Sequence, residues 1–310
     1  MQRKLYILSG VLSVLILVNV FFIFSFPKQN DGSSRQVSPP LNSTQAYIFP
    51  ISEPSYLPVL NTAIERPQLS AKSAIIYDTR SSRYLYSKNS EERLPIASLT
   101  KLLSALVVLE NLRLDDVVIV PKEALKVDGE KQTLYLDERM RVGELLEMML
   151  IESSNDAAYA LKLHASSSDL DLVGLMNRKA VELGMNNSIF HDPAGLNDDA
   201  LSTSDDLMKL IRYSLKFDEL WSTLGEKTKS IYSIDGKIEH KVVSTNHLLG
   251  VIPDIIGGKT GYTEKALGCM VLVVDVPGKN DKLISIVLGS TERFTDTEKL
   301  INWVKRAYTW

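Results

Sequence analysis

Cysteine and histidine are scarce in this chain, and their scarcity excludes several kinds of protein. The one cysteine, Cys269, cannot form an intramolecular disulfide framework or a multi-cysteine zinc site. The four histidines are scattered and lack the close spacing of metal ligands: His164, His191, His240 and His247. We therefore expect no metal site, and nothing in the sequence indicates a cofactor. The Gly-x-Ser-x-Gly motif of many histidine-dependent hydrolases is also missing.

An excess of basic residues is missing too. The 310 residues include 35 lysines and arginines against 38 aspartates and glutamates, which gives a formal net charge of −3. This balance provides no electrostatic basis for binding nucleic acid. With 45% hydrophobic and 24% charged residues, the composition is typical of a globular protein with one large or two modest domains.

One long apolar run is present, from Leu5 to Phe26, and it contains no charged residue. A helix of this length, rising about 1.5 Å per residue, spans a bilayer core of roughly 30 Å. Because Arg3 and Lys4 precede the run, we expect residues 1–4 in the cytoplasm, residues 5–26 as a single-pass anchor and the rest outside. A cleaved signal peptide is the alternative, although Phe24-Ser25-Phe26-Pro27 is a poor cleavage site.

The rest of the chain divides into a linker and a folded body. Residues 27–70 are rich in serine, proline, asparagine and glutamine and show no hydrophobic period, so we expect a linker there. Residues 71–310 then form the body.

Hydrophobic patterning within the body predicts its class. Two β-prone runs, 74–77 and 84–86, predict a hairpin. Apolar residues then recur at helical spacing over 99–112, 141–151, 156–164, 170–183 and 204–216. Strand-like patterns follow over 230–234, 238–243, 268–276 and 283–288, and an amphipathic helix over 297–308. We expect an α+β fold in which the hairpin and the late strands share a sheet, with residues 113–225 as a largely helical insertion. The seam between sheet and insertion is a usual place for a substrate cleft.

The first chemical motif is Ser98-Leu99-Thr100-Lys101, where a loop enters a helix. Lys101 follows Ser98 at i+3 and shares its helical face. A serine hydroxyl becomes a good nucleophile when a nearby base takes its proton, and a neutral lysine amine can be that base. The structural alternative makes Ser98 a helix N-cap and Lys101 a solvated charge.

The second motif, Ser153-Ser154-Asn155, follows an apolar run and precedes a new helix. A polar loop at a subdomain edge can direct Ser153 and Asn155 into a cleft, where they assist proton transfer and hold a substrate amide. The alternative is that Asn155 is only an N-cap.

The third motif is Lys259-Thr260-Gly261, preceded by Gly257 and Gly258. It is not a phosphate-binding loop, because Pro253 stands where that loop needs a glycine and a strand-like run follows. Glycines on a strand instead allow a ligand to approach the backbone closely. Lys259 and Thr260 then offer a cation and a hydroxyl to an anionic group.

Together the motifs resemble the S-x-x-K, S-D-N and K-T-G signature of the penicillin-recognising serine acyl-enzymes. Within this group of enzymes, the segments around the motifs resemble the D-alanyl-D-alanine carboxypeptidase family in particular. These segments are Leu94–Lys101, Ser153–Ala158, Asp192–Leu196 and Ser244–Asn246. The similarity extends over roughly residues 70–308. It implies a β-lactamase/DD-peptidase-like fold, with an antiparallel sheet flanked by helices and a mostly helical subdomain.

The resemblance also implies the activity and the catalytic residues. The enzyme would be a serine DD-carboxypeptidase that removes the terminal D-Ala from peptidoglycan stem peptides and that β-lactams inhibit covalently. Ser98 would attack the peptide carbonyl and Lys101 would be the general base. Ser153 and Asn155 would assist proton transfer and binding. The catalytic body would face the cell wall of a bacterium.

The binding residues implied by the resemblance lie on the third motif. Lys259 and Thr260 would fix the terminal carboxylate, and Gly261 and Tyr262 would continue the binding strand. By analogy the oxyanion hole would use the backbone N–H groups of Ser98 and Tyr262. Arg293 is a second candidate for binding the carboxylate, with a surface role as its alternative.

The sequence departs from the family pattern at Ser154, which stands where these carboxypeptidases commonly carry glycine or alanine.

Three other activities are alternatives to the carboxypeptidase. A DD-endopeptidase acting on cross-linked peptidoglycan is the main one. A class A β-lactamase would need a glutamate between the second and third motifs, and residues 190–199 contain none. An inactive peptidoglycan-binding module would have no need for Lys101.

Overall fold

The computed structural model describes residues 57–127, 133–276 and 281–310. The expected anchor at residues 5–26 and most of the expected linker lie outside these ranges. Within them, no helix combines the length and apolar character needed to cross a bilayer. The last part of the expected linker packs on the body, because β1 (Val59–Leu60) pairs with β13 (Tyr308–Thr309) and Ser70 donates a hydrogen bond to Asp296.

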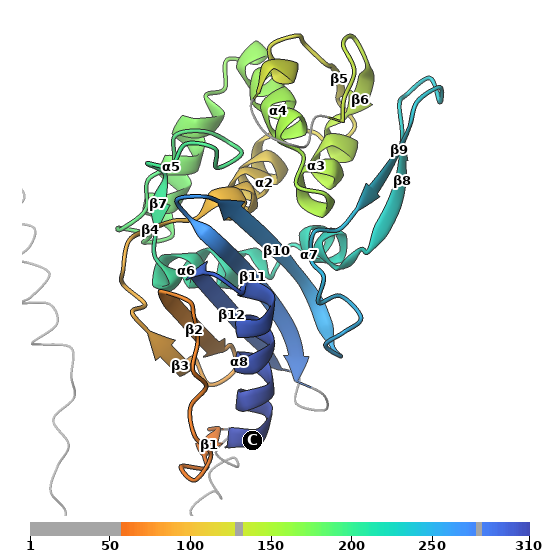
Figure 1. Cartoon of the computed structure of the whole chain (residues 1–310). Helices are drawn as coiled ribbons and strands as arrows, with labels where there is room; N and C mark the ends of the chain where they lie inside the picture. The colour runs from red at the N-terminus through yellow and green to blue at the C-terminus, as the bar shows by residue number, and fades with distance from the viewer. Residues whose placement is uncertain (1–56, 128–132, 277–280) are drawn as a thin grey trace, which may run out of the picture. The chain divides into compact units, whose positions relative to one another are not determined.

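A five-stranded antiparallel sheet forms the centre of the body, in the order β10-β11-β12-β2-β3 (Figure 1). Its strands are β2 (Ser73–Asp78), β3 (Arg83–Lys88), β10 (Ile255–Thr263), β11 (Leu267–Val276) and β12 (Asp281–Ser290). The predicted hairpin is β2–β3, and it joins the late strands where Ile75 lies opposite Ile286 of β12. This pairing confirms that the hairpin and the last strands share one sheet.

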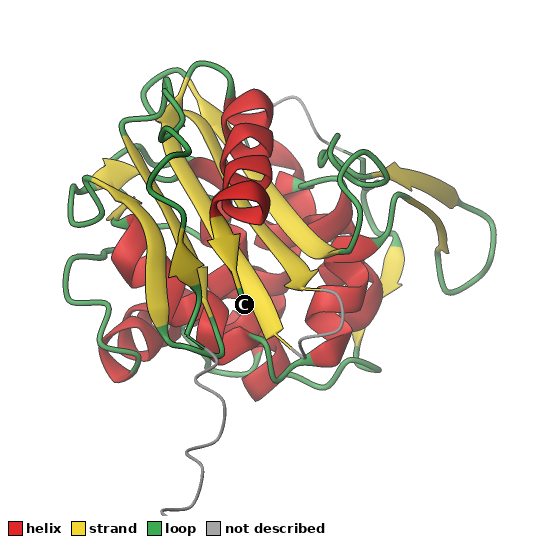
Figure 2. Cartoon of the chain, turned by 90° about the horizontal axis from the view of Figure 1, so that it is seen from below, coloured by secondary structure: helices red, strands yellow, loops and turns green. Residues whose placement is uncertain are grey.

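Both faces of this sheet are covered. All six residues of β2 are buried, and their side chains alternate between two cores. Ile75 and Tyr77 pack with the helical part of the body, whereas Ala74 and Ile76 pack with Trp303 of α8 (Arg293–Ala307). Figure 2 shows α8 lying on one face of the sheet, with the other helices behind it.

Helices dominate the segment between β3 and β10, as expected for the insertion. They are η1 (Ala97–Leu99), α2 (Thr100–Asn111), η2 (Ala124–Lys126), α3 (Val142–Ile151), α4 (Asn155–Ser167), α5 (Leu172–Glu182), α6 (Ser204–Ser214) and α7 (Asp218–Gly225). The sequence did not predict α7 or two short strand pairs, which are β4 (Leu94–Pro95) with β7 (Leu201–Ser202) and β5 (Val117–Ile119) with β6 (Arg139–Arg141). Elements of two or three residues are too short to show a hydrophobic period.

One expectation about the sheet is wrong. The runs at 230–234 and 238–243 form β8 (Thr228–Tyr232) and β9 (Glu239–Val243), which pair only with each other. Ile231 is the one buried residue of β8, and β9 alternates between exposed and buried positions. The hairpin packs against α3 instead, and its buried residues Ile231 and Val242 join the core on that side of the central sheet. In Figure 1 it extends away from the central sheet, on the side of α3.

Candidate active site

Ser98 and Lys101 lie at the seam between the central sheet and the helical insertion. Ser98 is half-buried in the 3₁₀ turn η1, and Lys101 is fully buried in the first turn of α2. Because η1 runs directly into α2, Ser98 does not cap the helix, and neither N-cap position shows a side-chain cap. The i+3 spacing brings Lys101 Nζ to 2.8 Å from Ser98 Oγ. The structure therefore favours the chemical interpretation of this motif over capping.

Two further oxygens orient the Lys101 amine. Asn155 Oδ1 lies 2.7 Å from Nζ and the backbone oxygen of Ala194 lies 3.0 Å away. Both are neutral acceptors from elements remote in sequence, α4 and the loop before β7. The first two motifs thus meet at this amine.

The loop that carries Ala194 is shaped by a buried carboxylate. Asp192 accepts hydrogen bonds from four successive backbone N–H groups, those of residues 194–197, at 2.6–3.2 Å. Gly195 has φ +78°, and a Cβ there would overlap the backbone oxygen of Ala97. The sequence placed Asp192 and Gly195 in a family-like run without assigning them a task. The structure shows that they hold the Ala194 carbonyl against Lys101.

Ser153 and Asn155 lie on either side of the start of α4. Ser154, not Asn155, is the N-cap, and its Oγ accepts from the N–H of Ala157 at 3.1 Å. Asn155 Oδ1 instead accepts from Lys101, so the alternative that Asn155 is only an N-cap does not hold. Ser153 has φ +69°, a left-handed conformation that is uncommon for serine.

The third motif lies on β10, at the edge of the central sheet. Lys259 Nζ donates to Ser153 Oγ at 2.8 Å, so this strand meets the second motif. Thr260 Oγ1 lies 2.6 Å from Thr245 Oγ1, a partner that the sequence indicated only as part of a family-like flank. At Gly261 a Cβ would lie 3.0 Å from both Ser98 N and Ile96 O, so any larger residue there would push β10 away from the serine by a few tenths of an ångström.

A cavity of about 800 Å³ connects these side chains. Six of the eight predicted site residues line it, and they are Ser98, Ser153, Asn155, Thr260, Gly261 and Tyr262. Lys101 and Lys259 are buried at its floor, with exposed fractions of 0% and 1%. His247 and Arg293 line it as well, and the Arg293 guanidinium lies 5.9 Å from the ring of Tyr262. Burial lowers the pKa of Arg293 from its ordinary value, but the group remains a cation.

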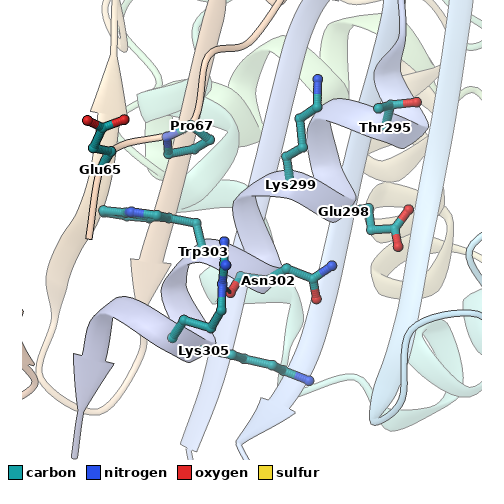
Figure 3. Close-up of a pocket in the computed structure, with 9 residues that line it drawn as sticks. Glu65, Pro67, Thr295, Glu298, Lys299, Asn302, Trp303 and Lys305 are labelled. Atoms are coloured by element: carbon teal, nitrogen blue, oxygen red, sulfur yellow. Dashed lines mark hydrogen bonds between the residues drawn. The ribbon is translucent and has the colours of Figure 1, made fainter. Parts of the chain in front are cut away.

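A second cavity, of about 610 Å³, lies elsewhere on the body (Figure 3). It separates α8 from the segment that carries Glu65 and Pro67, and Lys299 and Asn302 line its helical side. None of the three sequence motifs contributes a residue to its lining, whereas all three line the cavity at the seam. The cavity at the seam is therefore the candidate active site.

Other groups in the described ranges do not compete with it. No cluster of three metal-ligating side chains occurs among the described residues. Cys269 is fully buried in β11, and burial raises the pKa of its thiol to about 11. The thiol therefore stays protonated at neutral pH and is a poor nucleophile.

Comparison with known families agrees with this geometry. The family model described as D-alanyl-D-alanine carboxypeptidase matches residues 60–292. The chain belongs to this family. The result confirms the predicted family and the expectation of a peptidase.

Relatives and solved structures support the same assignment. Over 247 residues the chain is 32% identical to D-alanyl-D-alanine carboxypeptidase DacF of Bacillus subtilis, a match that covers 77% of this chain and 63% of that protein. It is also 32% identical to a D-alanyl-D-alanine endopeptidase of Pseudomonas aeruginosa over 249 residues, or 77% and 78% of the two proteins. Penicillin-binding protein D2 from Listeria monocytogenes, in its cefotaxime-bound form, superposes with a TM-score of 0.68 and 32% identity, covering 78% of this chain and 99% of that one. The predicted fold class is thereby confirmed.

Proposed function

We propose that this chain is a serine DD-carboxypeptidase that removes the terminal D-Ala of peptidoglycan stem peptides through an acyl-enzyme on Ser98. The observation that carries the proposal is the 2.8 Å contact between Ser98 Oγ and the buried Lys101 Nζ at the floor of an open cavity. A neutral amine has two N–H groups and one lone pair. Asn155 Oδ1 and Ala194 O accept hydrogen bonds from this amine and so hold it beside the Ser98 hydroxyl, whose proton the lone pair of the neutral amine can take.

In the acylation step, Ser98 Oγ attacks the carbonyl of the penultimate D-Ala while its proton passes to Lys101. The backbone N–H groups of Ser98 and Tyr262 stabilise the oxyanion. Cleavage of the C–N bond then releases D-Ala, whose amine takes a proton through Ser153. Ser153 Oγ accepts a hydrogen bond from Lys259 Nζ and lies on the cavity wall, which supports this relay. Water hydrolyses the Ser98 ester and regenerates the enzyme.

The terminal carboxylate of the substrate is held on β10. Lys259 supplies a buried positive charge and Thr260 a hydroxyl, while Gly261 and Tyr262 line the cavity beyond them. Arg293 adds a second cation on the same wall, so we assign it to carboxylate binding as well.

Covalent labelling with a fluorescent penicillin tests the nucleophile. We expect one labelled serine per wild-type chain, identified as Ser98 by peptide mass spectrometry, and no label on Ser98→Ala. A wild-type chain that stays unlabelled, or a Ser98→Ala variant that is labelled, would contradict the mechanism. Because Asp192 is occupied by backbone N–H groups and residues 190–199 contain no glutamate, we expect the penicilloyl ester to persist rather than turn over as in a β-lactamase.

A second candidate activity is DD-endopeptidase cleavage of cross-linked peptidoglycan, which is the activity named for the Pseudomonas aeruginosa relative. The same acyl-enzyme chemistry serves both reactions, and only the leaving group differs. Parallel assays of D-Ala release from a pentapeptide and of cleavage of a cross-linked dimer separate them. We expect the pentapeptide to be the better substrate, and a preference for the dimer would assign the endopeptidase activity instead.

We also propose the placement of the enzyme. Residues 5–26 anchor the chain in a bacterial cell membrane with residues 1–4 in the cytoplasm, and residues 27–56 link this anchor to a catalytic body that includes β1. The support is the uncharged apolar run that follows Arg3 and Lys4. Membership of a family of cell-wall enzymes supports a position of the body on the outer side of the membrane. A cleaved signal peptide is the competing arrangement.

A further inference from the structure

The turn that presents Ser153 to the active site is strained. Ser153 has φ +69°, where a side chain with a Cβ is disfavoured by roughly 1–2 kcal/mol. In this conformation its hydroxyl lies 2.8 Å from Lys259 Nζ, and Asn155, two residues on, accepts from Lys101 at 2.7 Å. A turn that relaxed to a negative φ would move both contacts. Something outside the turn must therefore hold it in place.

The carboxylate of Asp156 is the group that does so. It is fully buried, and it does not line the cavity. Its Oδ1 accepts hydrogen bonds from the hydroxyl of Ser154 and from the N–H of Ala157 at 2.9 Å. Its Oδ2 accepts from the N–H groups of Thr133 and Leu134 at 2.6 and 2.8 Å. One oxygen therefore holds the turn and the other holds a separate segment of chain.

The segment at residues 133–138 is itself attached to the hairpin β8–β9. The N–H of Tyr135 donates to Glu138 Oε2 at 3.0 Å, and Glu138 Oε1 lies 2.6 Å from His240 Nε2 of β9. Glu138 and His240 are both buried, with exposed fractions of 5% and 7%. The support for the Ser153 turn thus runs from Asp156 through residues 133–138 to β9.

We propose that Asp156 is a positioning residue for acylation, which locks the strained turn of Ser153 and Asn155 to residues 133–134. It acts through Ser153 and Asn155 and does not touch the substrate. The inference rests on the proposed acyl-enzyme function. Hydrogen bonds to a buried carboxylate are the stronger kind, and four of them from two segments resist displacement of the turn.

The test measures acylation by a fluorescent penicillin in the full chain, as a saturating rate constant and a half-saturating concentration. We expect Asp156→Ala to lower the saturating rate constant roughly a hundredfold, the usual effect of displacing catalytic groups by about 1 Å. Asp156→Asn keeps one acceptor oxygen and should retain an intermediate rate. The half-saturating concentration should change much less, and every folded chain should still be labelled at completion.

Asp296 provides a matched control. It is also fully buried, and it accepts from the N–H groups of Ser70 and Ala71 and from two serine hydroxyls, none of which lines the active-site cavity. Asp296→Ala should lower the melting temperature without lowering the saturating rate constant of the folded chains.

The following outcomes separate a positioning role of Asp156 from a purely structural one and from failure of the proposed function. A wild-type rate constant in folded Asp156→Ala, or an equal loss in Asp296→Ala, overturns the positioning role. If Asp156→Ala does not fold, Asp156→Asn decides alone, and a wild-type rate constant there also overturns the role. Failure of the wild-type chain to be labelled would instead contradict the proposed function, so the two failures are distinguishable.

Discussion

Two buried lysines lie below the cavity, and their contacts assign them different tasks. Lys101 contacts Ser98, the proposed nucleophile. Lys259 lies on β10, the strand proposed to bind the substrate carboxylate, and contacts Ser153. Lys101→Ala should therefore reduce the saturating acylation rate by roughly 10²–10⁴-fold, the contribution of general acid–base catalysis. Lys259→Ala should mainly raise the half-saturating concentration of carboxylate-bearing substrates. Rapid-mixing measurements of penicillin acylation give both constants.

Because Lys101 is buried, Lys101→Ala also leaves a cavity, and a variant that preserves the packing is needed to separate this effect from the loss of the amine. Lys101→Met keeps most of the side-chain volume but has no amine, so it should be as inactive as Lys101→Ala while it unfolds at a higher temperature. Normal acylation by Lys101→Met would mean that another group takes the Ser98 proton.

At the scale of elements, the loop at residues 192–197 depends on a glycine that the backbone of η1 crowds. Gly195 and Gly236 both have positive φ, at +78° and +70°. A Cβ at Gly195 would overlap Ala97 O, whereas a Cβ at Gly236 would meet nothing within 4 Å. Gly236→Ala should cost only the conformational penalty of roughly 1–2 kcal/mol. Gly195→Ala should cost roughly 1–3 kcal/mol more from overpacking.

The same pair of variants separates stability from catalysis. Gly195→Ala should also slow acylation, because it displaces the Ala194 carbonyl from Lys101, whereas Gly236→Ala should not. Urea unfolding and penicillin acylation measure the two effects. Equal stability losses in the two variants would show that the contact with Ala97 does not constrain the loop.

The hairpin β8–β9 carries a pH-dependent contribution to stability. The hydrogen bond to Glu138 raises the pKa of His240 above its ordinary value of 6.5, despite the opposing effect of burial, and the charges of Glu152 and Asp156 add to it. Tyr135, Glu239 and Lys241 also border this site. A histidine whose folded pKa is raised binds its proton more tightly in the folded state. Its contribution is therefore complete below pH 6.5 and is lost as the pH rises through the folded pKa.

Glu138→Gln tests this contribution. We expect the variant to be less stable than the wild type by about 1–3 kcal/mol near pH 6, the size of a hydrogen bond to a charged group. The difference should shrink as the pH rises above 6.5. Urea unfolding between pH 5.5 and 8.5 measures it, and a difference that grows with pH would contradict the assigned sign.

The elements that the sequence predicted are those with a strong local signal. Ser98 and Lys101 share one helical turn, and the long strands and helices show their hydrophobic period. The supports of the site have no such signal, because Asp156 and Asp192 bind backbone N–H groups, which every residue type except proline supplies. Thr245 and His240 meet their partners only after folding brings β8–β9 and β10 to the insertion. The motifs therefore indicated the residues that line or border the cavity, and only the structure shows what holds them in place.

At the scale of the whole molecule, we expect the apolar run at residues 5–26 to determine membrane attachment and the folded body to determine acylation, independently of each other. A chain that starts at residue 57 keeps β1, the central sheet and every residue of the proposed active site. We expect this truncated chain to be recovered in the soluble fraction and to acylate at the wild-type rate. The full chain should remain with the membrane fraction, because an uncharged, largely apolar run of 22 residues, rising about 1.5 Å per residue, matches the bilayer core. Recovery of the full-length product without residues 1–26, shown by mass spectrometry of its N-terminus, would establish a signal peptide in place of the anchor while leaving the catalytic assignment intact.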